Sequence, residues 1–104
     1  MVCAPDLRNQ GDLRPEFGRG ARGHASLHNS EEHYAWSSLV LGKPLLGQRV
    51  TDIQAVLQGI RSRAGWAGRP VAIAASGFTT VPALFAAAID KRLDRVYLSG
   101  GLLS

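Results

Sequence analysis

This sequence has little cysteine, no long apolar run and no charged leader segment. Its 104 residues contain one cysteine, Cys3, so a disulfide within the chain is excluded. No apolar run approaches the roughly 20 residues of a membrane-spanning helix, and no charged start followed by an apolar stretch indicates a signal peptide. A disulfide-rich secreted class and a membrane class are therefore not expected, and the cytoplasm is the default expectation for the compartment.

Acidic residues are also fewer than basic ones. Twelve Lys and Arg against eight Asp and Glu give a formal net charge of +4 and a pI of about 10.0. A nucleic-acid surface usually needs basic residues clustered on one face, with aromatics or a recognition helix. Here they are scattered through predicted loops and helix ends, so a nucleic-acid partner is not expected. Hydrophobic residues make up 45% of the chain, which excludes a disordered tail.

The first thirty residues predict little regular structure. Residues 2–4 are apolar and predict the end of a short buried strand, which would also bury the Cys3 thiol. Residues 6–30 are rich in Gly, Arg, Asn and Ser, a composition that predicts a long loop. A loop of this length usually lies near a functional face or is mobile.

A helical segment is predicted over residues 31–62. Its first helix begins at Ser30, where a hydroxyl followed by two acids favours a helix N-terminus, and it ends at Gly42 and Pro44. The apolar residues of this helix have helical spacing: Ala35, Trp36, Leu39 and Val40. The second helix, from about 46 to 62, has an apolar stripe formed by Val50, Ile53, Val56, Leu57 and Ile60. We expect Trp36, like Trp66 in the turn that follows, to serve core or hinge packing.

A strand, a tight turn, a helix and a second strand are predicted over residues 71–99. Val71–Ala75 is a continuous apolar run, which is typical of a parallel strand covered on both faces. The helix runs from about 81 to 89, with Thr80 as its cap and Pro82 in its first turn, and residues 95–99 predict the last strand. The fold class is therefore α/β. We expect a partial doubly wound, mostly parallel sheet with about three strands and three helices, in a single partial domain over 1–104.

Three stretches of the chain resemble parts of one known family. Ala4–Gly11 is similar to a strand and loop that usually carry Asp-x-Arg-Gly-x-Gly, with Asn9 here in place of the first glycine. Tyr34–Ile60 resembles the long helical segment before that family's nucleophile strand. Arg69–Asp90 and Val96–Leu98 resemble the nucleophile strand, its elbow, the next helix and the next strand. The family is the α/β-hydrolase superfamily, in its acetyl xylan esterase and deacetylase branch.

The resemblance implies a nucleophile elbow of the form G-x-S-x-G, in which a strained strand-to-helix turn exposes the serine hydroxyl. Counted from the strand and from the helix, the nucleophile position falls on Gly77, with Ala75 and Thr79 at the small flanking positions. A shifted register makes Ser76 the catalytic candidate, but it places the bulky Phe78 where close packing requires a small residue. Ser76 is therefore the less favoured nucleophile, and is otherwise a turn serine bonded to nearby backbone.

A histidine is missing where this family places its catalytic base. The acid and the histidine follow the nucleophile in that fold. The three histidines of this chain all precede Gly77: His24, His28 and His33. The resemblance also implies a third strand between residues 2–4 and 71–75, and a loop with a second oxyanion donor, neither of which this chain contains. We therefore expect an internal fragment of an ester hydrolase, inactive as this chain alone, whose full-length parent takes a small ester or an acetylated carbohydrate.

Two other functions remain as alternatives. The same scaffold, having lost its serine, can serve as a non-catalytic binding or structural module, and a small basic nucleic-acid binder is the least favoured function. A strand that lacks cover and neighbours also predicts weak stability and self-association of the fragment.

No cofactor or metal ion is expected. Gly18–Gly23 matches G-x-G-x-x-G, but this dinucleotide motif requires a strand before it and a helix after it, and neither is predicted here. The three histidines, with Glu31 and Glu32, straddle a loop and a helix start. No two of these histidines share a helix face, so a solvated polar loop is the better interpretation.

Overall fold

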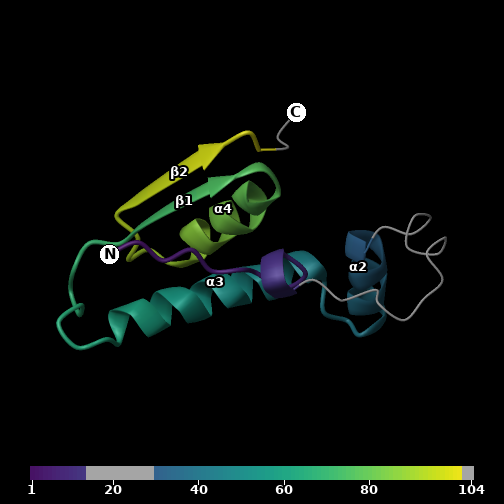
Figure 1. Cartoon of the computed structure of the whole chain (residues 1–104), viewed down its shortest axis with the longest axis horizontal. Coiled ribbons are helices and arrows are strands. Elements are labelled where there is room, and N and C mark those ends of the chain that lie inside the picture. The colour runs from purple at the N-terminus through teal and green to yellow at the C-terminus, as the bar shows by residue number, and fades with distance from the viewer. Residues whose placement is uncertain (14–29, 102–104) are drawn as a thin grey trace. The chain divides into compact units, whose positions relative to one another are not determined.

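The computed structural model describes residues 1–13 and 30–101 and divides the chain into two compact units, Met1–Gln48 and Arg49–Ser104. Its helices and strands follow one another in the order shown in Figure 1: η1 Gly11–Leu13, α2 Ser30–Val40, α3 Leu45–Arg61, β1 Ala72–Ser76, η2 Gly77–Thr79, α4 Thr80–Ile89 and β2 Arg95–Ser99. Helices therefore alternate with a small parallel sheet, and the chain is an α/β protein.

The start of the first unit differs from the prediction. Residues 2–4 belong to no helix or strand, and Cys3 is exposed. Backbone N–H and C=O groups form a strand only when a neighbouring strand pairs with them. The two strands among the described residues, β1 and β2, pair with each other. The expectation of a buried strand and a buried thiol is therefore wrong for these residues.

A tight turn over residues 6–12 brings the chain back on itself. The Asp6 carboxylate accepts a hydrogen bond of 3.0 Å from the backbone N–H of Asp12. Gly11 has a φ of +50°, and a Cβ at this position would lie 2.2 Å from the Asp6 side chain, so another residue would be strained and would displace the Asp6 carboxylate. The predicted loop over 6–30 is thus described only to residue 13, and residues 14–29 lie outside the described part of the chain.

Asn9 connects this turn to the start of α2. It has a φ of 62°, a left-handed conformation that glycine adopts freely and asparagine tolerates. Its side chain is buried, and its amide donates a hydrogen bond of 2.7 Å to the Glu31 carboxylate. The neighbouring Arg8 donates a hydrogen bond to the Gln48 side chain. Asn9 therefore occupies a backbone position of the kind that more often holds glycine.

Helix α2 has the predicted bounds but not the predicted packing. Gly42, at a φ of +67°, ends the helix, and its N–H donates to the Leu39 carbonyl at 2.9 Å. Trp36 is 62% exposed and Leu39 54%, whereas Ser38 is buried. Most of the apolar stripe is therefore exposed, and the expectation of core packing for Trp36 is wrong.

Helix α3 confirms its predicted apolar stripe. Val50 and Leu57 are buried within the second unit, and Ile53, Val56 and Ile60 are half-buried on the same stripe. The turn after α3 contains Trp66, which is half-buried and stacks against the Arg69 guanidinium at 5.0 Å from the ring centre. The prediction of helical packing at period 3.6 therefore holds for this segment.

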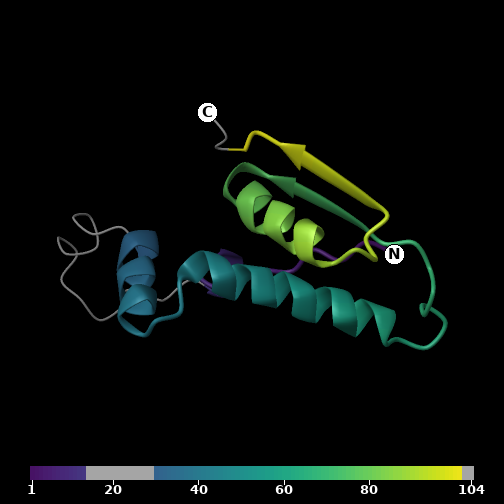
Figure 2. The same cartoon turned by 180° about the vertical axis from the view of Figure 1, so that it is seen from behind.

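The second unit is built on a strand–helix–strand crossover. β1 and β2 are parallel, with Ala72 opposite Arg95 and Ser76 opposite Ser99 at the two ends of the register. Helix α4 connects them and lies on one face of the sheet, as both views show (Figures 1 and 2). The side chains of α4 that are buried are small or compact: Thr80, Pro82, Ala83 and Ala86.

The sheet is covered on one face. Ile73 and Ala75 are half-buried, whereas the alternate side chains of β1 are exposed: Ala72, Ala74 and Ser76. The apolar run favours cover on both faces, and the described residues provide it on one, as expected for a strand that lacks part of its cover and neighbours. A parallel strand needs a helix layer on each side for full burial, and α4 supplies one of them.

Asp90 links the ends of two helices. It follows the last residue of α4, and its carboxylate accepts hydrogen bonds from the Arg61 side chain at the end of α3 and from Arg92 Nε at 3.1 Å. The Asp90 side chain is 8% exposed. Hydrogen bonds from Arg61 and then from Arg92 hold the pKa of the Asp90 carboxyl well below its ordinary value.

We predict that Asp90→Ala lowers the free energy of unfolding by about 1–3 kcal/mol at pH 7, because it leaves a largely buried guanidinium without its partner. Since the folded pKa is depressed, the stabilisation is present above the ordinary carboxyl pKa of about 3.9 and is lost as the pH falls further. Urea denaturation followed by circular dichroism at pH 7 and at low pH measures both effects. Lys91→Ala, at the exposed neighbouring residue, is the control and is expected to change little. An equal loss in both variants contradicts the assignment.

Candidate functional site

The candidate site lies where β1 turns into α4. Ser76, the last residue of β1, is extended, with φ −135° and ψ 153°, whereas Thr80 is already helical, with φ −63° and ψ −40°. Between them Gly77 has a φ of +57°. The strand therefore changes into a helix within a few residues, and the residue that absorbs the change is a glycine. These elements match the strand, tight turn and helix that the sequence predicts.

Two threonine hydroxyls hold this turn. Thr79 Oγ1 donates to the Ser76 carbonyl at 2.8 Å and accepts the Ser76 N–H at 3.3 Å. Thr80 Oγ1 donates to the Gly77 carbonyl at 2.7 Å. The sequence predicts Thr80 as the cap of this helix, but Thr80 is the first residue of α4 and Thr79 stands at the cap position. The sequence also did not reveal that Thr79 binds both backbone groups of Ser76. The signal available was the serine–x–x–threonine spacing, which resembles a capping box.

The Gly77 position faces open space. A Cβ built on Gly77 would meet no atom within 4 Å, so a side chain here would project freely from the turn. The loop after β2 lies close by, because a Cβ on Gly100 would lie 3.9 Å from the Gly77 backbone nitrogen. The tip of the turn is thus exposed, as a nucleophile position must be. Glycine, however, provides no hydroxyl there.

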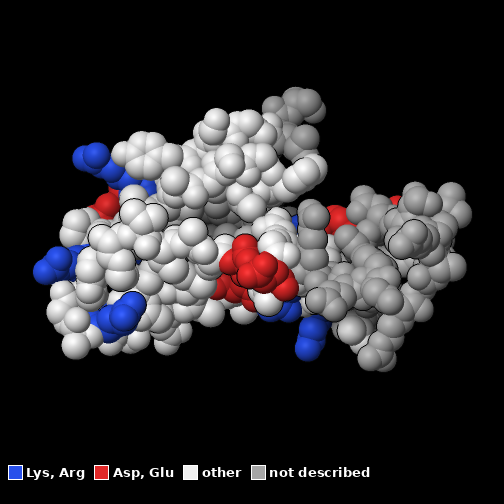
Figure 3. All heavy atoms as spheres, in the orientation of Figure 1, with Lys and Arg blue, Asp and Glu red and all other residues white. Residues whose placement is uncertain are grey.

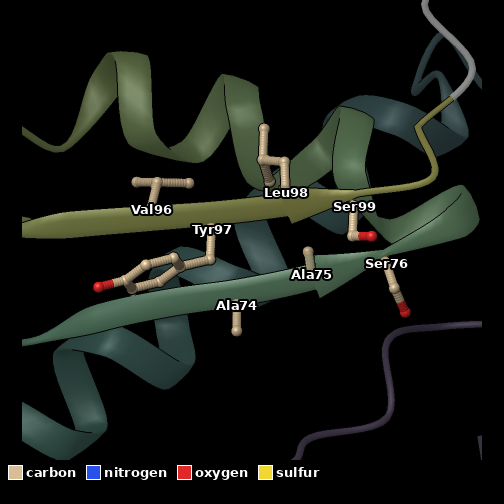
Figure 4. Close-up of a pocket in the computed structure, with 7 residues that line it drawn as sticks. All are labelled: Ala74, Ala75, Ser76, Val96, Tyr97, Leu98 and Ser99. Carbon is tan, nitrogen blue, oxygen red and sulfur yellow. The ribbon is translucent and has the colours of Figure 1, made fainter.

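Ser76 lies beside the tip and on the uncovered face of the sheet. Its side chain is exposed, and in Figure 4 it points away from β2. Ser99 stands opposite it in the register. The second unit contains no histidine in its sequence. Ser76 therefore has a hydroxyl but, within its own unit, no imidazole to accept its proton.

The ends of the two strands line a shallow open hollow of about 700 Å³ (Figure 4). Its lining is mostly apolar, with two serine hydroxyls at the carboxyl ends of the strands: Ala74, Ala75, Ser76, Val96, Tyr97, Leu98 and Ser99. In open α/β sheets, ligands bind beyond the carboxyl ends of the strands. The hollow therefore lies on the side of the sheet where a small ligand would be expected.

The described polar residues of the first unit form no cluster that could hold a metal ion. No three His, Cys, Asp or Glu side chains come together within residues 1–13 and 30–101. His33 lies in the first turn of α2 with Glu31 and Glu32. His24, His28 and the glycine motif over 18–23 lie outside the described residues. No helix in the described part of the chain is long and apolar enough to cross a bilayer.

Comparison with known proteins adds no relative. No protein-family model, no curated protein and no solved structure matches the chain. Any functional argument therefore depends on the residues and on the geometry of the turn.

We predict that Gly77→Ala and Gly59→Ala change stability in opposite directions, although an added Cβ meets no atom within 4 Å at either position. Gly77→Ala places an L-residue at positive φ and is expected to lose about 1–2 kcal/mol. Gly59, exposed within α3, is expected to gain about 0.5–1 kcal/mol because alanine favours the helix. Urea denaturation measures both values. A neutral or stabilising Gly77→Ala contradicts the strained turn.

Proposed function

We propose that this chain is a segment of an α/β-hydrolase-like ester hydrolase of the acetyl xylan esterase type, and that it has no esterase activity by itself. One observation carries the proposal. A parallel strand turns abruptly into a helix through a residue at positive φ, whose side-chain position is open to solvent. A turn of this kind is what a nucleophile elbow requires of the backbone, and it supports the proposal.

The surroundings of the turn support Gly77, and not Ser76, at the nucleophile position. In this register Phe78 is the residue directly after the nucleophile, and its 74% exposure suits a position that packs against nothing. Ala75 and Thr79 then take the two small flanking positions. In the alternative register Phe78 would stand where helix and strand approach closely, which its exposure does not favour.

The incomplete sheet supports the view that the chain is part of a larger fold. β1 has one uncovered face and one strand neighbour among the described residues. A partial doubly wound sheet, with a third strand beside β1 and a second helix layer, would supply what is missing. A small ester or acetylated carbohydrate would then bind in the full-length protein beyond the strand ends, near the hollow at Ser76 and Ser99.

The missing groups explain the proposed lack of activity. Ester hydrolysis by a serine requires its oxygen to attack the carbonyl carbon while an imidazole accepts the hydroxyl proton. Gly77 has no hydroxyl, and no histidine follows it in the sequence. One oxyanion donor, the backbone N–H after the nucleophile position, remains available at Phe78. A single donor without a nucleophile and a base does not catalyse the reaction.

A non-catalytic binding or structural module is the second candidate function. The glycine at the tip of the turn favours it, because a scaffold that has lost its serine keeps its shape but not its chemistry. A nucleic-acid binder is less well supported. On the face drawn in Figure 3, the basic side chains of the described residues stand apart from one another and form no continuous patch.

We predict that the purified chain hydrolyses p-nitrophenyl acetate no faster than buffer, and that Ser76→Ala and Gly77→Ser leave this rate unchanged. Gly77→Ser restores a hydroxyl at the tip but not the base that would activate it. Turnover by the natural chain that Ser76→Ala abolishes would make Ser76 the nucleophile and would overturn the proposal.

The segment proposal has a separate test in the coding DNA on both sides of this chain. In-frame or frameshifted sequence is expected there, encoding the rest of a hydrolase fold with its acid and its histidine. Flanking DNA without such sequence leaves the non-catalytic module as the better function.

A further inference from the structure

The sheet of the second unit has an unusually unprotected edge. Among the described residues it contains two strands, so β1 has β2 on one edge and no strand on the other. Natural edge strands are usually protected by charged residues, by proline or by a bulge. Ala72–Ser76 contains no charged residue and no proline, whereas β2 begins with Arg95. The free edge of β1 is therefore the one that is open to a further strand.

The side chains of β1 also allow another backbone to approach. Those on the uncovered face are small and exposed: Ala72, Ala74 and Ser76. A two-stranded sheet is marginally stable in water, and three or more strands are normally needed. Exposed apolar side chains on the same strand pair include Tyr97, at 56%, and Leu98, at 39%. Pairing with further strands would therefore stabilise this two-stranded sheet.

We propose that the free edge of β1 pairs with β1 of a second copy of this chain, antiparallel and about a two-fold axis at Ala74. The two sheets then join into one of four strands, in the order β2, β1, β1 and β2. Ala74 faces Ala74 of the other copy, Ala72 faces Ser76, and Ile73 faces Ala75. Every pair contains a small side chain and none contains a charge. The proposal concerns this chain by itself, because in a longer hydrolase-like protein the proposed third strand would take the same edge of β1.

This edge favours a closed dimer over open-ended polymerisation. A two-fold interface uses the same edge on both copies and consumes it, so assembly stops at a dimer. Further growth would have to proceed through the outer edge of β2, where the charged Arg95 is of the kind that discourages edge pairing. The seam is five residues long and much smaller than a standard interface. We therefore expect weak association, with a dissociation constant on the order of 0.1 mM.

The two-fold axis allows a charge-swap test. Ala74→Lys and Ala74→Glu each place like charges directly opposite one another in the dimer, so each variant alone is expected to be monomeric. An equal mixture of the two places Lys opposite Glu and is expected to dimerise again. Tyr97→Lys is the matched control, because Tyr97 is the register partner of Ala74 on the same face but on the other strand.

Sedimentation velocity over about 0.01–1 mM measures the dissociation constant, and circular dichroism verifies that each variant keeps its helix content. Dimerisation of the natural chain and of Tyr97→Lys, loss in each single Ala74 variant, and recovery in the mixture support the proposal. A natural chain that stays monomeric over this range overturns it. So does a mixture that fails to recover, or a Tyr97→Lys variant as monomeric as Ala74→Lys, which would assign the contact to the face of the sheet and not to the edge.

Discussion

The left-handed backbone at Gly77 is the constraint on which the second unit depends. Two parallel strands cannot be joined by a tight hairpin, so the chain must leave the end of β1 and return along a crossover helix. With a φ of +57° at Gly77, the chain turns from the extended conformation of Ser76 into α4 at once. The hydroxyls of Thr79 and Thr80 bind the backbone on both sides of this point and hold it. The helix can then pack its smallest side chains against the sheet.

The same turn connects the fold with the proposed function. An abrupt turn exposes whatever side chain stands at its tip, and this exposure makes such turns suitable for nucleophiles. Glycine at the tip avoids the strain that an L-residue would bear there, but it provides no hydroxyl that could act as a nucleophile. The abrupt turn and the proposed lack of activity are therefore two consequences of one residue, Gly77.

The sheet is covered incompletely, so side chains expected to be buried are exposed, although the helices and strands over residues 30–99 form where the sequence predicts them. Val71–Ala75 was expected to be a strand because its run is apolar, and β1 is a strand. The uniform apolarity also indicated cover on both faces, and here Ala72 and Ala74 are exposed. Trp36 and Leu39 show the same contrast in α2, where the helix forms but its apolar stripe stays open. An apolar pattern records which faces are suited to burial, and the neighbouring elements decide whether burial takes place.

Local physical chemistry thus allowed the sequence by itself to determine the helices α2, α3 and α4, the two strands, and the glycine between Ser76 and Phe78. Helical spacing, capping residues and positive-φ glycines act over a few residues, so they can be recognised in the chain. The tertiary structure alone decided that Asp90 binds Arg61, 29 residues earlier in the chain. Among the described residues, it also decided that residues 2–4 pair with no strand and that Ala72 and Ala74 lie on the exposed face of the sheet. These features depend on groups far apart in the chain, or on partners that are missing, and no local pattern encodes them.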